Sequence, residues 1–348
     1  AHFGEVIWAE FASDSEIRDR YYDNDASKFE AHSYLKVNYK IKKLTLYGDL
    51  QYRHIGYQFL GIDDVSGVIK EVDRTLNFDF FNPKAGLMYD FNDHNNLYAS
   101  FALANREPVR RDFRESTPKN QPKPENLMNV ELGYRYKGNK LMLNANAYYM
   151  YYKDQLVLTG QINDVGDYTR TNVEKSYRAG IEIETAIRIT KKLSFMANAT
   201  LSSNKIIAFN EYVSNYDTGG QDTIAHTNTD IAFSPNIIAA AGLRFEPIKD
   251  WNISLMGKHV GAQYLDNTSA STRKMKAFTT FNFQMDYTFK EVFFKEITIG
   301  VLVNNIFNQK YAANGYTWGY IYVSERTDEN FYYPQAGTNF LARLVFKL

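Results

Sequence analysis

Hydrophobic and polar residues alternate along many stretches of the chain with a period of two. Segment 140–153, KLMLNANAYYMYYK, places Leu143 and its alternate neighbours on one face and Asn144 and its neighbours on the other. Successive side chains of a strand point to opposite faces, so this alternation predicts a β-strand. Segment 127–137 alternates in the same way, and the polar residues 138–139 join the two. The pair therefore predicts a long hairpin with one apolar side.

The same pattern recurs along the chain and predicts about 13 or 14 strands, nearly all antiparallel neighbours in a meander. The predicted strands are 4–12, 31–41, 43–58, 76–91, 95–104, 127–137, 140–153, 176–190, 192–206, 235–247, 250–264, 277–290, 295–306 and 338–348.

Short and long connections alternate between these strands. The short connections are 41–43, 92–95, 137–139, 190–192 and 247–250, and the long ones are 59–75, 105–126, 154–175, 207–234, 265–276 and 307–337. Outer-membrane barrels have short periplasmic turns and longer extracellular loops. The fold class that we predict is therefore all-β, an antiparallel transmembrane β-barrel meander.

The composition supports a membrane strand protein more than a soluble one. The chain of 348 residues has 27 Tyr, 24 Phe and 3 Trp, which suits aromatic girdles at the two membrane surfaces. It contains no run of 18 apolar residues that could form a transmembrane helix. A soluble sandwich or solenoid is the alternative, but the strand lengths and the asymmetry of the loops fit it poorly.

Charge and motif content exclude several function classes. The 40 basic and 40 acidic residues balance, so nothing draws the whole chain to nucleic acid. The absence of cysteine excludes thiolate catalysis and Cys-ligated metals. The sequence has no GxSxG, HExxH or P-loop motif, and its six His are scattered singly. We therefore expect no enzyme, no bound metal and no cofactor.

Several stretches resemble the C-terminal barrel of the TonB-dependent outer-membrane receptors, in a form like those of the Bacteroides group. They are YASFALANREP at 98–108, PKPENLMNVELGYRY at 122–136, NVEKSYRAGIEIE at 172–184, VNNIFNQKY at 303–311 and the final segment 337–348. The resemblance covers nearly the whole chain, and the motifs follow one another in the order of the family.

The resemblance implies a barrel of about 22 strands with an N-terminal plug domain and a TonB-contacting segment. This sequence shows neither a plug nor that segment. We therefore expect residues 1–348 to be a single, incomplete domain, the C-terminal part of the barrel with the plug absent. The expected location is the outer membrane of a Gram-negative bacterium.

The function that the resemblance implies is active import of a scarce solute. The expected partners are the TonB-ExbB-ExbD complex acting through the plug region, outer-membrane lipid and a small-molecule metal chelate. A ferric siderophore is the first expectation for the ligand, followed by cobalamin. The alternatives are a glycan importer of the same family, a passive channel or porin of about 14 strands, and an adhesion barrel or one that docks a surface lipoprotein.

Candidate ligand contacts lie in the long loops. Loop 105–126 contains Arg106, Arg110, Arg111 and Arg114 with Phe113, and several guanidinium groups could clamp an anionic chelate. The alternative is a loop that docks on the plug or on its neighbours. Receptors of the haem branch carry a haem-ligating His here, and this loop has none, so haem is disfavoured.

Aromatic and lumen-facing residues complete the candidate site. Aromatic faces suit catecholates, corrins or sugars, unless the loops simply pack on each other; the candidates are Tyr212, Tyr216, Tyr316, Trp318 and Tyr320. Charged residues on the polar face are expected to hold the plug or line a solute path, unless they form a solvated wall; these are Glu131, Arg135, Glu182, Glu184, Arg188 and Asp286.

Overall fold

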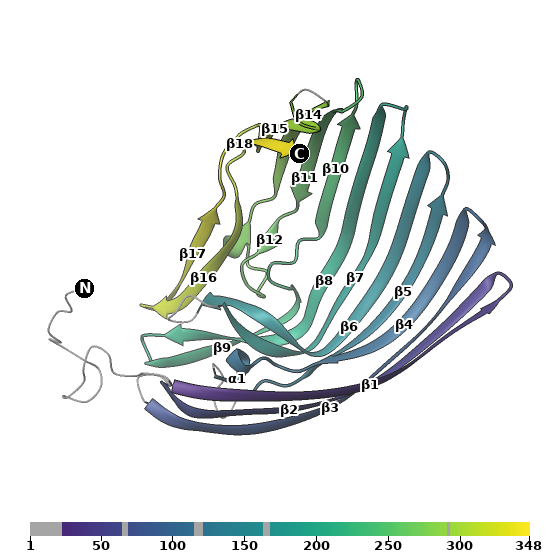
Figure 1. Ribbon diagram of the computed structural model, residues 1–348. Helices are drawn as coiled ribbons and strands as arrows, with labels where there is room; N and C mark the ends of the chain where they lie inside the picture. Colours follow the sequence, from purple (N-terminus) through teal and green to yellow (C-terminus); the bar gives the residue numbers. More distant parts are fainter. Residues whose placement is uncertain (1–22, 65–68, 115–120, 163–167, 291–292) are drawn as a thin grey trace. The chain divides into compact units, whose positions relative to one another are not determined.

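The computed structural model describes residues 23–64, 69–114, 121–162, 168–290 and 293–348 (Figure 1). The chain divides into two compact units, the first formed by residues 1–37 and 49–83 and the second by residues 38–48 and 84–348. The predicted strand 4–12 lies outside the described residues. In the described part of the chain, no helix is long and apolar enough to cross a membrane.

The first unit contains parts of three strands that are neighbours in the sheet. Polar side chains join these strands. Arg53 Nη2 lies 3.0 Å from Glu30 Oε1, and Tyr52 Oη donates to Asp79 Oδ1 over 2.6 Å. Each strand is longer than predicted, and the second and third extend into the expected loop 59–75. The strands are β1 (Asp23–Ile41), β2 (Leu44–Asp64) and β3 (Ile69–Asn92).

The second unit contains a row of antiparallel strands, which we call the wall. Each strand of the wall pairs with the next one named, which confirms the predicted all-β antiparallel meander (Figure 1). Within the described residues the strand order ends at β18 without closing. The wall strands are β4 (Asn95–Arg106), β5 (Glu125–Lys137), β6 (Leu141–Ile162), β7 (Tyr168–Arg188), β8 (Leu193–Asn215), β10 (Ile237–Phe245), β11 (Trp251–Val260), β14 (Phe278–Lys290), β15 (Glu296–Asn304) and β18 (Asn339–Lys347).

The predicted short turns lie where the sequence places them, and polar side chains fix them. Asn92 Oδ1 accepts hydrogen bonds from the backbone N–H groups of His94 (2.9 Å) and Asn95 (3.0 Å). Thr190 Oγ1 accepts from the N–H of Lys192 at 3.1 Å and of Leu193 at 3.0 Å. Such side chains satisfy backbone donors that the strands leave unpaired at a tight reversal.

Two of the predicted long loops contain strands that the sequence did not predict, and the ends of β6 and β7 extend into the predicted loop 154–175. Residues 207–234 include the end of β8 and β9 (Gly220–Asp230), and residues 307–337 include a hairpin of β16 (Ala312–Tyr322) and β17 (Glu325–Pro334). The predicted strand count was therefore too low. Neither β9 nor β17 has a consistently apolar face, and the alternation that reveals a membrane strand is weak in them.

Shorter elements occupy other predicted loops. Loop 105–126 contains a single helical turn, and loop 265–276 contains a 3-10 turn. The predicted strand 250–264 is interrupted after Val260. The elements are α1 (Arg110–Arg114), η1 (Ser271–Arg273), β12 (Gln263–Tyr264) and β13 (Lys274–Met275).

The apolar face of the wall has large side chains with no protein cover. Leu132 and Ile181 are each 51% exposed, and Ile183 is 45% exposed. Contiguous apolar patches of this kind are rare on soluble monomers. A hydrocarbon environment accommodates them, because the outward face of a transmembrane barrel is an apolar band.

On the opposite, polar face, tyrosine rings lie over glycines of the next strand. Tyr98 and Gly133 are cross-strand partners, and a Cβ added to Gly133 would lie 2.1 Å from Tyr98 Cζ. Tyr98 Oη donates to Asn146 Oδ1 over 3.1 Å, and Arg135 Cζ lies 4.6 Å from the centre of its ring. The glycine therefore gives the ring room to lie flat against the wall.

Replacing this glycine tests the arrangement. Gly133→Ala is expected to displace the Tyr98 ring and destabilise the wall by about 1–3 kcal/mol, the usual cost of overpacking. Gly48→Ala is the matched control, because nothing lies within 4 Å of a Cβ at that strand glycine. Thermal unfolding of the protein in detergent measures both variants. Equal melting temperatures for the two would contradict the proposed role of Gly133.

Candidate functional site

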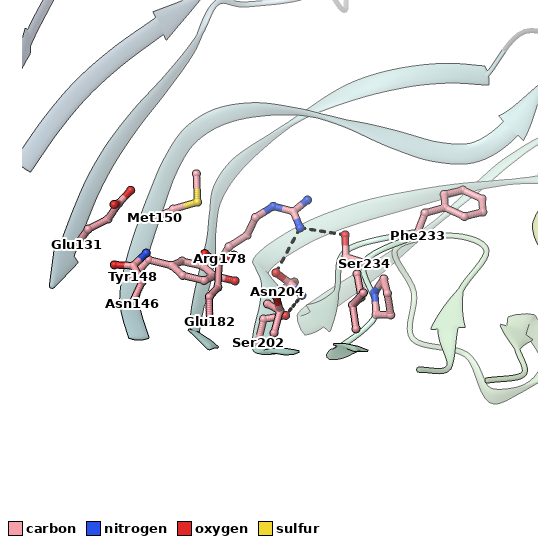
Figure 2. A pocket seen from close by; sticks show the side chains of 13 residues that line it. Glu131, Asn146, Tyr148, Met150, Arg178, Glu182, Ser202, Asn204, Phe233 and Ser234 are labelled. Atoms are coloured by element: carbon pink, nitrogen blue, oxygen red, sulfur yellow. Dashed lines mark hydrogen bonds between the residues drawn. The ribbon is translucent and has the colours of Figure 1, made fainter. Parts of the chain in front are cut away.

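The polar face of β5 to β8 contains a pocket of about 350 Å³ (Figure 2). Arg178 is its central cation, and Arg178 Nη1 donates to Asn204 Oδ1 over 3.3 Å and to Ser234 Oγ over 3.0 Å. The pocket brings together two of the predicted lumen-facing residues, Glu131 and Glu182. It is a polar recess in the wall that can hold the side chains of a second element.

The other predicted lumen-facing residues lie elsewhere on the wall. Glu184 accepts a hydrogen bond of 3.0 Å from Asn144, and Asp286 accepts one of 2.8 Å from Arg343 Nη2. Arg188 lies at the short-turn end in a separate recess, and Arg135 covers the Tyr98 ring. The structure therefore distributes these charges along the wall, and most of them have a local partner.

A second polar site lies where β8 extends past the wall. The first part of β8 pairs with β10 and the last part, from Lys205 onward, pairs with β9. Near the start of this extension, a small buried apolar cluster is formed by Val157, Val173, Ile206 and Ile231. The cluster anchors the extension of β8, so that its polar side chains are held at defined positions.

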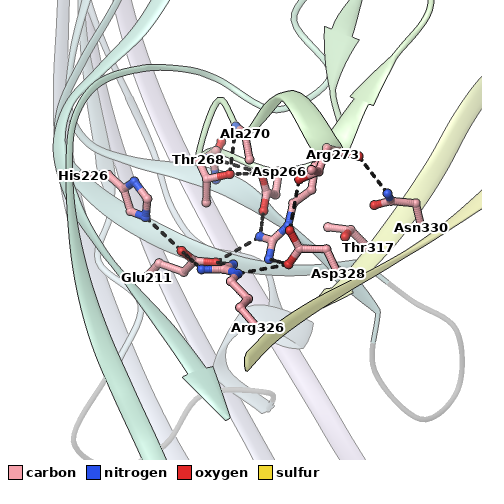
Figure 3. Close-up of polar contacts among 12 residues, drawn as sticks. Glu211, His226, Asp266, Thr268, Ala270, Arg273, Thr317, Arg326, Asp328 and Asn330 are labelled. Carbon is pink, nitrogen blue, oxygen red and sulfur yellow. Dashed lines mark hydrogen bonds and ion pairs between the residues drawn. The ribbon is translucent and has the colours of Figure 1, made fainter. Parts of the chain in front are cut away.

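Arg273 is the centre of this second site (Figure 3). Its side chain is only 3% exposed, and it forms ion pairs with Glu211 of β8, with Asp266 and with Asp328 of β17. The Arg273 Nη1 to Glu211 Oε1 distance is 3.0 Å. One guanidinium group thus joins three segments of the chain.

Arg326 and His226 complete the network. Arg326 Nε donates to Asp328 Oδ1 over 3.0 Å, and Arg326 Nη1 donates to Glu211 Oε2 over 3.2 Å. His226 of β9 bonds the same Glu211 oxygen through Nε2 at 2.9 Å. We call Glu211, His226, Asp266, Arg273, Arg326 and Asp328 the arginine network.

The two arginines of the network keep the Glu211 and Asp328 carboxylates ionised. Burial alone would raise the pKa of Glu211, but hydrogen bonds from Arg326 and His226 outweigh burial and hold the pKa below its ordinary 4.5. Burial likewise opposes ionisation of Asp328, and hydrogen bonds from Arg273 and Arg326 lower its pKa below 3.8. Glu211 and Asp328 therefore face the two arginines as carboxylates at neutral pH.

The tip of the β16–β17 hairpin is attached to β8 as well. Tyr320 and Ile321 pair in parallel with Ser214 and Asn215. The Asp217 carboxylate accepts hydrogen bonds from the backbone N–H groups of Val323 at 2.8 Å and Ser324 at 2.7 Å. Val323 has φ 52°, an unfavourable conformation for a β-branched residue. The Asp217 hydrogen bonds stabilise this strained turn.

A cavity of about 420 Å³ lies between the arginine network, β7, the extension of β8 and β16. We call it the hairpin cavity. Hydroxyl, amide and aromatic groups dominate its lining together with network residues: Thr159, Thr169, Arg170, Thr171, Phe209, Asn210, Glu211, Tyr212, Val213, Gln221, Asp266, Asn267, Thr268, Arg273, Thr317 and Gly319.

One arginine of the predicted clamp is held by an internal ion pair, and a neighbouring carboxylate on α1 faces β7. Arg106 Nε forms an ion pair of 2.7 Å with Glu125, and the Asp112 carboxylate lies 3.6 Å from Arg170 Nη1. Phe113 is only 3% exposed, so its ring presents no face to a ligand in this structure. Arg110 and Arg111 lie partly exposed on α1, and Arg114 ends that helix with a side chain outside the described part.

Of the predicted aromatic contacts, Tyr212 lines the hairpin cavity and the others lie outside its lining. Tyr316 stacks on Phe331 with ring centres 4.7 Å apart, and Tyr216 packs edge-on against Tyr320 at 5.7 Å. Trp318 is 39% exposed. Most of the aromatic residues therefore stabilise the hairpin and its contact with β8.

Sequence reasoning did not identify the arginine network. Arg273 is separated from Glu211 by 62 positions and from Asp328 by 55, and Arg326 is separated from Glu211 by 115. No local spacing connects these residues, so only the fold brings them together.

Comparison with known proteins identifies the family. The sequence model of the family described as "TonB dependent receptor-like, beta-barrel" matches residues 6–306. The chain belongs to the TonB-dependent receptor family. The chain is thus a barrel segment of the Gram-negative outer membrane, from a family of transporters rather than enzymes, as the sequence motifs predicted.

Solved receptors share the fold at low sequence identity. The siderophore receptor PiuA from Acinetobacter baumannii aligns with a TM-score of 0.73 and 18% identity, over 93% of this chain and 44% of that chain. The ferric-catecholate import receptor Fiu from Escherichia coli K12 gives 0.68 and 16%, over 92% and 44%.

The copper transporter OprC also aligns, with a TM-score of 0.68 and 18% identity over 92% of this chain and 48% of that chain. The chain therefore spans less than half the length of these receptors. The search of curated proteins gives no match.

Removing the central cation tests the arginine network. Arg273→Ala leaves three carboxylates facing one another, and breaking a buried pair in this way costs about 3–5 kcal/mol. We expect the β16–β17 hairpin to become sensitive to protease. Arg326→Ala is the comparison, because this side chain is 30% exposed and its loss costs about 1 kcal/mol or less. Equal protease sensitivity of the two variants would contradict a central role for Arg273.

The attachment of the β16–β17 hairpin to β8 is expected to depend on pH only at acidic pH. A carboxylate whose pKa is lowered by folding stabilises above its ordinary pKa, and this contribution is lost as the pH falls through the lowered value. The ordinary pKa values of glutamate and aspartate are 4.5 and 3.8, and both Glu211 and Asp328 have lowered values. The hairpin is therefore expected to remain attached as the pH falls from neutral to these ordinary values, and to loosen progressively at lower pH.

A nitroxide label measures this directly. The chain has no cysteine, so Tyr322→Cys gives a single labelling site at the tip of the hairpin. Label mobility should rise in acid, and in an Asp328→Asn background the part of the rise due to Asp328 should disappear. A rise between pH 7 and pH 5 in the unmodified network would contradict the assignment.

Proposed function

We propose that this chain forms part of the barrel wall of an active-transport receptor. The receptor binds a scarce solute on its long-loop side and imports it with energy from the TonB-ExbB-ExbD complex. The family match over residues 6–306 carries the proposal. The hairpin cavity at the long-loop end supports it, because it offers a place where a solute can bind before transport.

The pocket around Arg178 on the polar face of β5 to β8 supports a second part of the proposal. Glu131, Arg178 and Glu182 are on the polar face, and we propose that they contact a plug domain in the complete receptor. The other lumen-facing charges, Arg135, Glu184, Arg188 and Asp286, would face the plug or the solute path. A plug held by such polar contacts can be rearranged without unfolding the wall.

The proposal includes closure of the barrel by further strands, to about 22 in total. A strand edge without a partner is costly in lipid, because no water is available to its N–H and C=O groups. The strand order of the described residues ends without closing, and the chain covers 44% of the receptor PiuA. Both observations support a wall that is part of a larger barrel.

A ferric siderophore is the first candidate for the solute, and cobalamin the second. The names of PiuA and Fiu as siderophore and ferric-catecholate receptors support the first candidate. Arg110 and Arg111, partly exposed on α1, could contact an anionic chelate at the rim.

Uptake in paired strains tests the energy source. The complete receptor is produced in cells with and without a functional TonB protein, and accumulation of radiolabelled ferric siderophores and cobalamin is measured. We expect accumulation only with TonB, and binding to whole cells in both strains, because TonB drives release and transport rather than capture. Equal accumulation in both strains, or a steady open conductance in planar bilayers, would favour a passive channel instead.

A further inference from the structure

We propose that the short-turn end of the wall binds the anionic headgroups of phospholipids in the surrounding membrane. The contacts are the ammonium groups of Lys191, Lys249 and Lys295 and the apolar side chains of Ile248 and Phe293, which together we call the basic rim. This contact does not depend on which solute the receptor imports.

The short turns of the wall carry many lysines. The chain as a whole has 40 basic and 40 acidic residues, so this end of the wall departs from the balance of the chain. Antiparallel hairpins place the turns at one edge of the wall (Figure 1). The lysines of turns 41–43, 137–140, 190–192 and 247–250 and of residues 293–295 are Lys42, Lys43, Lys137, Lys140, Lys191, Lys192, Lys249 and Lys295.

The acidic residues near these turns are fewer and do not neutralise them. Asp250 is paired with Lys290 at 2.8 Å, and Glu296 is paired with Lys347 at 3.2 Å. The remaining carboxylates in or next to the turns are Asp93 and Glu246. The short-turn edge of the wall therefore has an excess of positive charge.

The three lysines of the basic rim are available to a ligand. Lys191, Lys249 and Lys295 are exposed, and within the described part of the chain their ammonium groups form no hydrogen bond or ion pair. By contrast, Lys43 Nζ donates to the Phe91 carbonyl over 2.7 Å. A free ammonium group offers three donors and a full positive charge, so each rim lysine can bind an anionic oxygen.

Exposed apolar side chains lie next to two of these lysines in the sequence. Ile248 precedes Lys249 and is 52% exposed, and Phe293, two positions before Lys295, is 88% exposed. Lysines alone are common on any solvated surface. Lysines beside exposed apolar residues are typical of a membrane interface, where the apolar group enters the acyl boundary and the ammonium group stays at the headgroups. A phospholipid therefore satisfies both kinds of side chain, whereas a soluble anion satisfies the lysines alone.

Backbone hydrogen bonds hold the turns of the basic rim side by side. The N–H of Glu246 donates to the Lys192 carbonyl over 2.8 Å, which links the β7–β8 turn to the β10–β11 connection. The N–H of Thr288 donates to the Asp250 carbonyl over 3.0 Å and links that connection to the end of β14. The three lysines thus lie on neighbouring hairpins, and basic residues held near a membrane surface attract anionic lipids.

The experiment compares an anionic with a zwitterionic lipid. The complete receptor, purified from outer membranes into detergent, is titrated with phosphatidylglycerol and with phosphatidylethanolamine, and native mass spectrometry counts the bound lipids. The test variant combines Lys191→Gln, Lys249→Gln and Lys295→Gln. The control variant removes three exposed lysines toward the long-loop end by combining Lys153→Gln, Lys276→Gln and Lys310→Gln.

We expect the unmodified receptor to bind phosphatidylglycerol more tightly than phosphatidylethanolamine, by about fivefold for a headgroup that meets one lysine. The test variant should lose this preference and the control variant should keep it. Added salt should reduce the preference in the unmodified receptor, because salt screens exposed charges. The salt series needs no substitution, so it tests the basic rim even where a variant fails to fold.

Equal affinity of the unmodified receptor for the two lipids would overturn the proposal. So would a preference that persists in the test variant, or one that is lost equally in the control variant. Displacement of phosphatidylglycerol by inorganic phosphate at constant ionic strength would indicate a simple phosphate site, and it would also overturn docking of the lipid.

Discussion

The need to pair every backbone N–H and C=O group inside a membrane is the constraint on which the wall depends. Hydrocarbon offers no water to an unpaired amide, so membrane-crossing strands must bond to neighbours along their length. The antiparallel ladders from β4 to β18 meet this requirement. Once paired, alternate side chains face opposite directions, and Ile181 and Ile183 can be exposed to lipid while Glu182 faces the polar recess.

The same alternation gives each strand two independent surfaces. The apolar surface has to be compatible with lipid and little else, whereas the polar surface can hold specific groups. Tyr98 lying over Gly133 and the recess around Arg178 are examples of the second kind. Functional variation can therefore accumulate on the polar face and in the long-loop regions without disturbing the ladders.

Beyond the membrane the constraint changes, because water can satisfy backbone groups and neither face of a strand must be apolar. The extension of β8 is stabilised instead by a small apolar cluster and by the arginine network. Arg273 is almost fully buried, and burying its charge is tolerated because three carboxylates surround it. The network attaches β17 to β8.

Sequence alone determined the wall. The alternation in 140–153 and 127–137 predicted β6 and β5, and the alternation of short and long connections predicted a barrel, because lipid imposes a period of two on every crossing strand. Polar turn residues such as Asn92 marked the reversals. The motifs of the family then gave the transport class, since each lies on consecutive residues.

Only the tertiary structure decided the candidate site. Strands β9 and β17 lack the alternation that lipid imposes on a crossing strand, so their sequences read as loops. Phe113 looked like a ligand contact and is buried, while Arg273, Glu211 and Asp328 looked unrelated and form one network. Local periodicity reports what a residue faces across one strand. It carries no information on which distant side chain will meet it, because that depends on how the extension of β8 and the hairpin pack together.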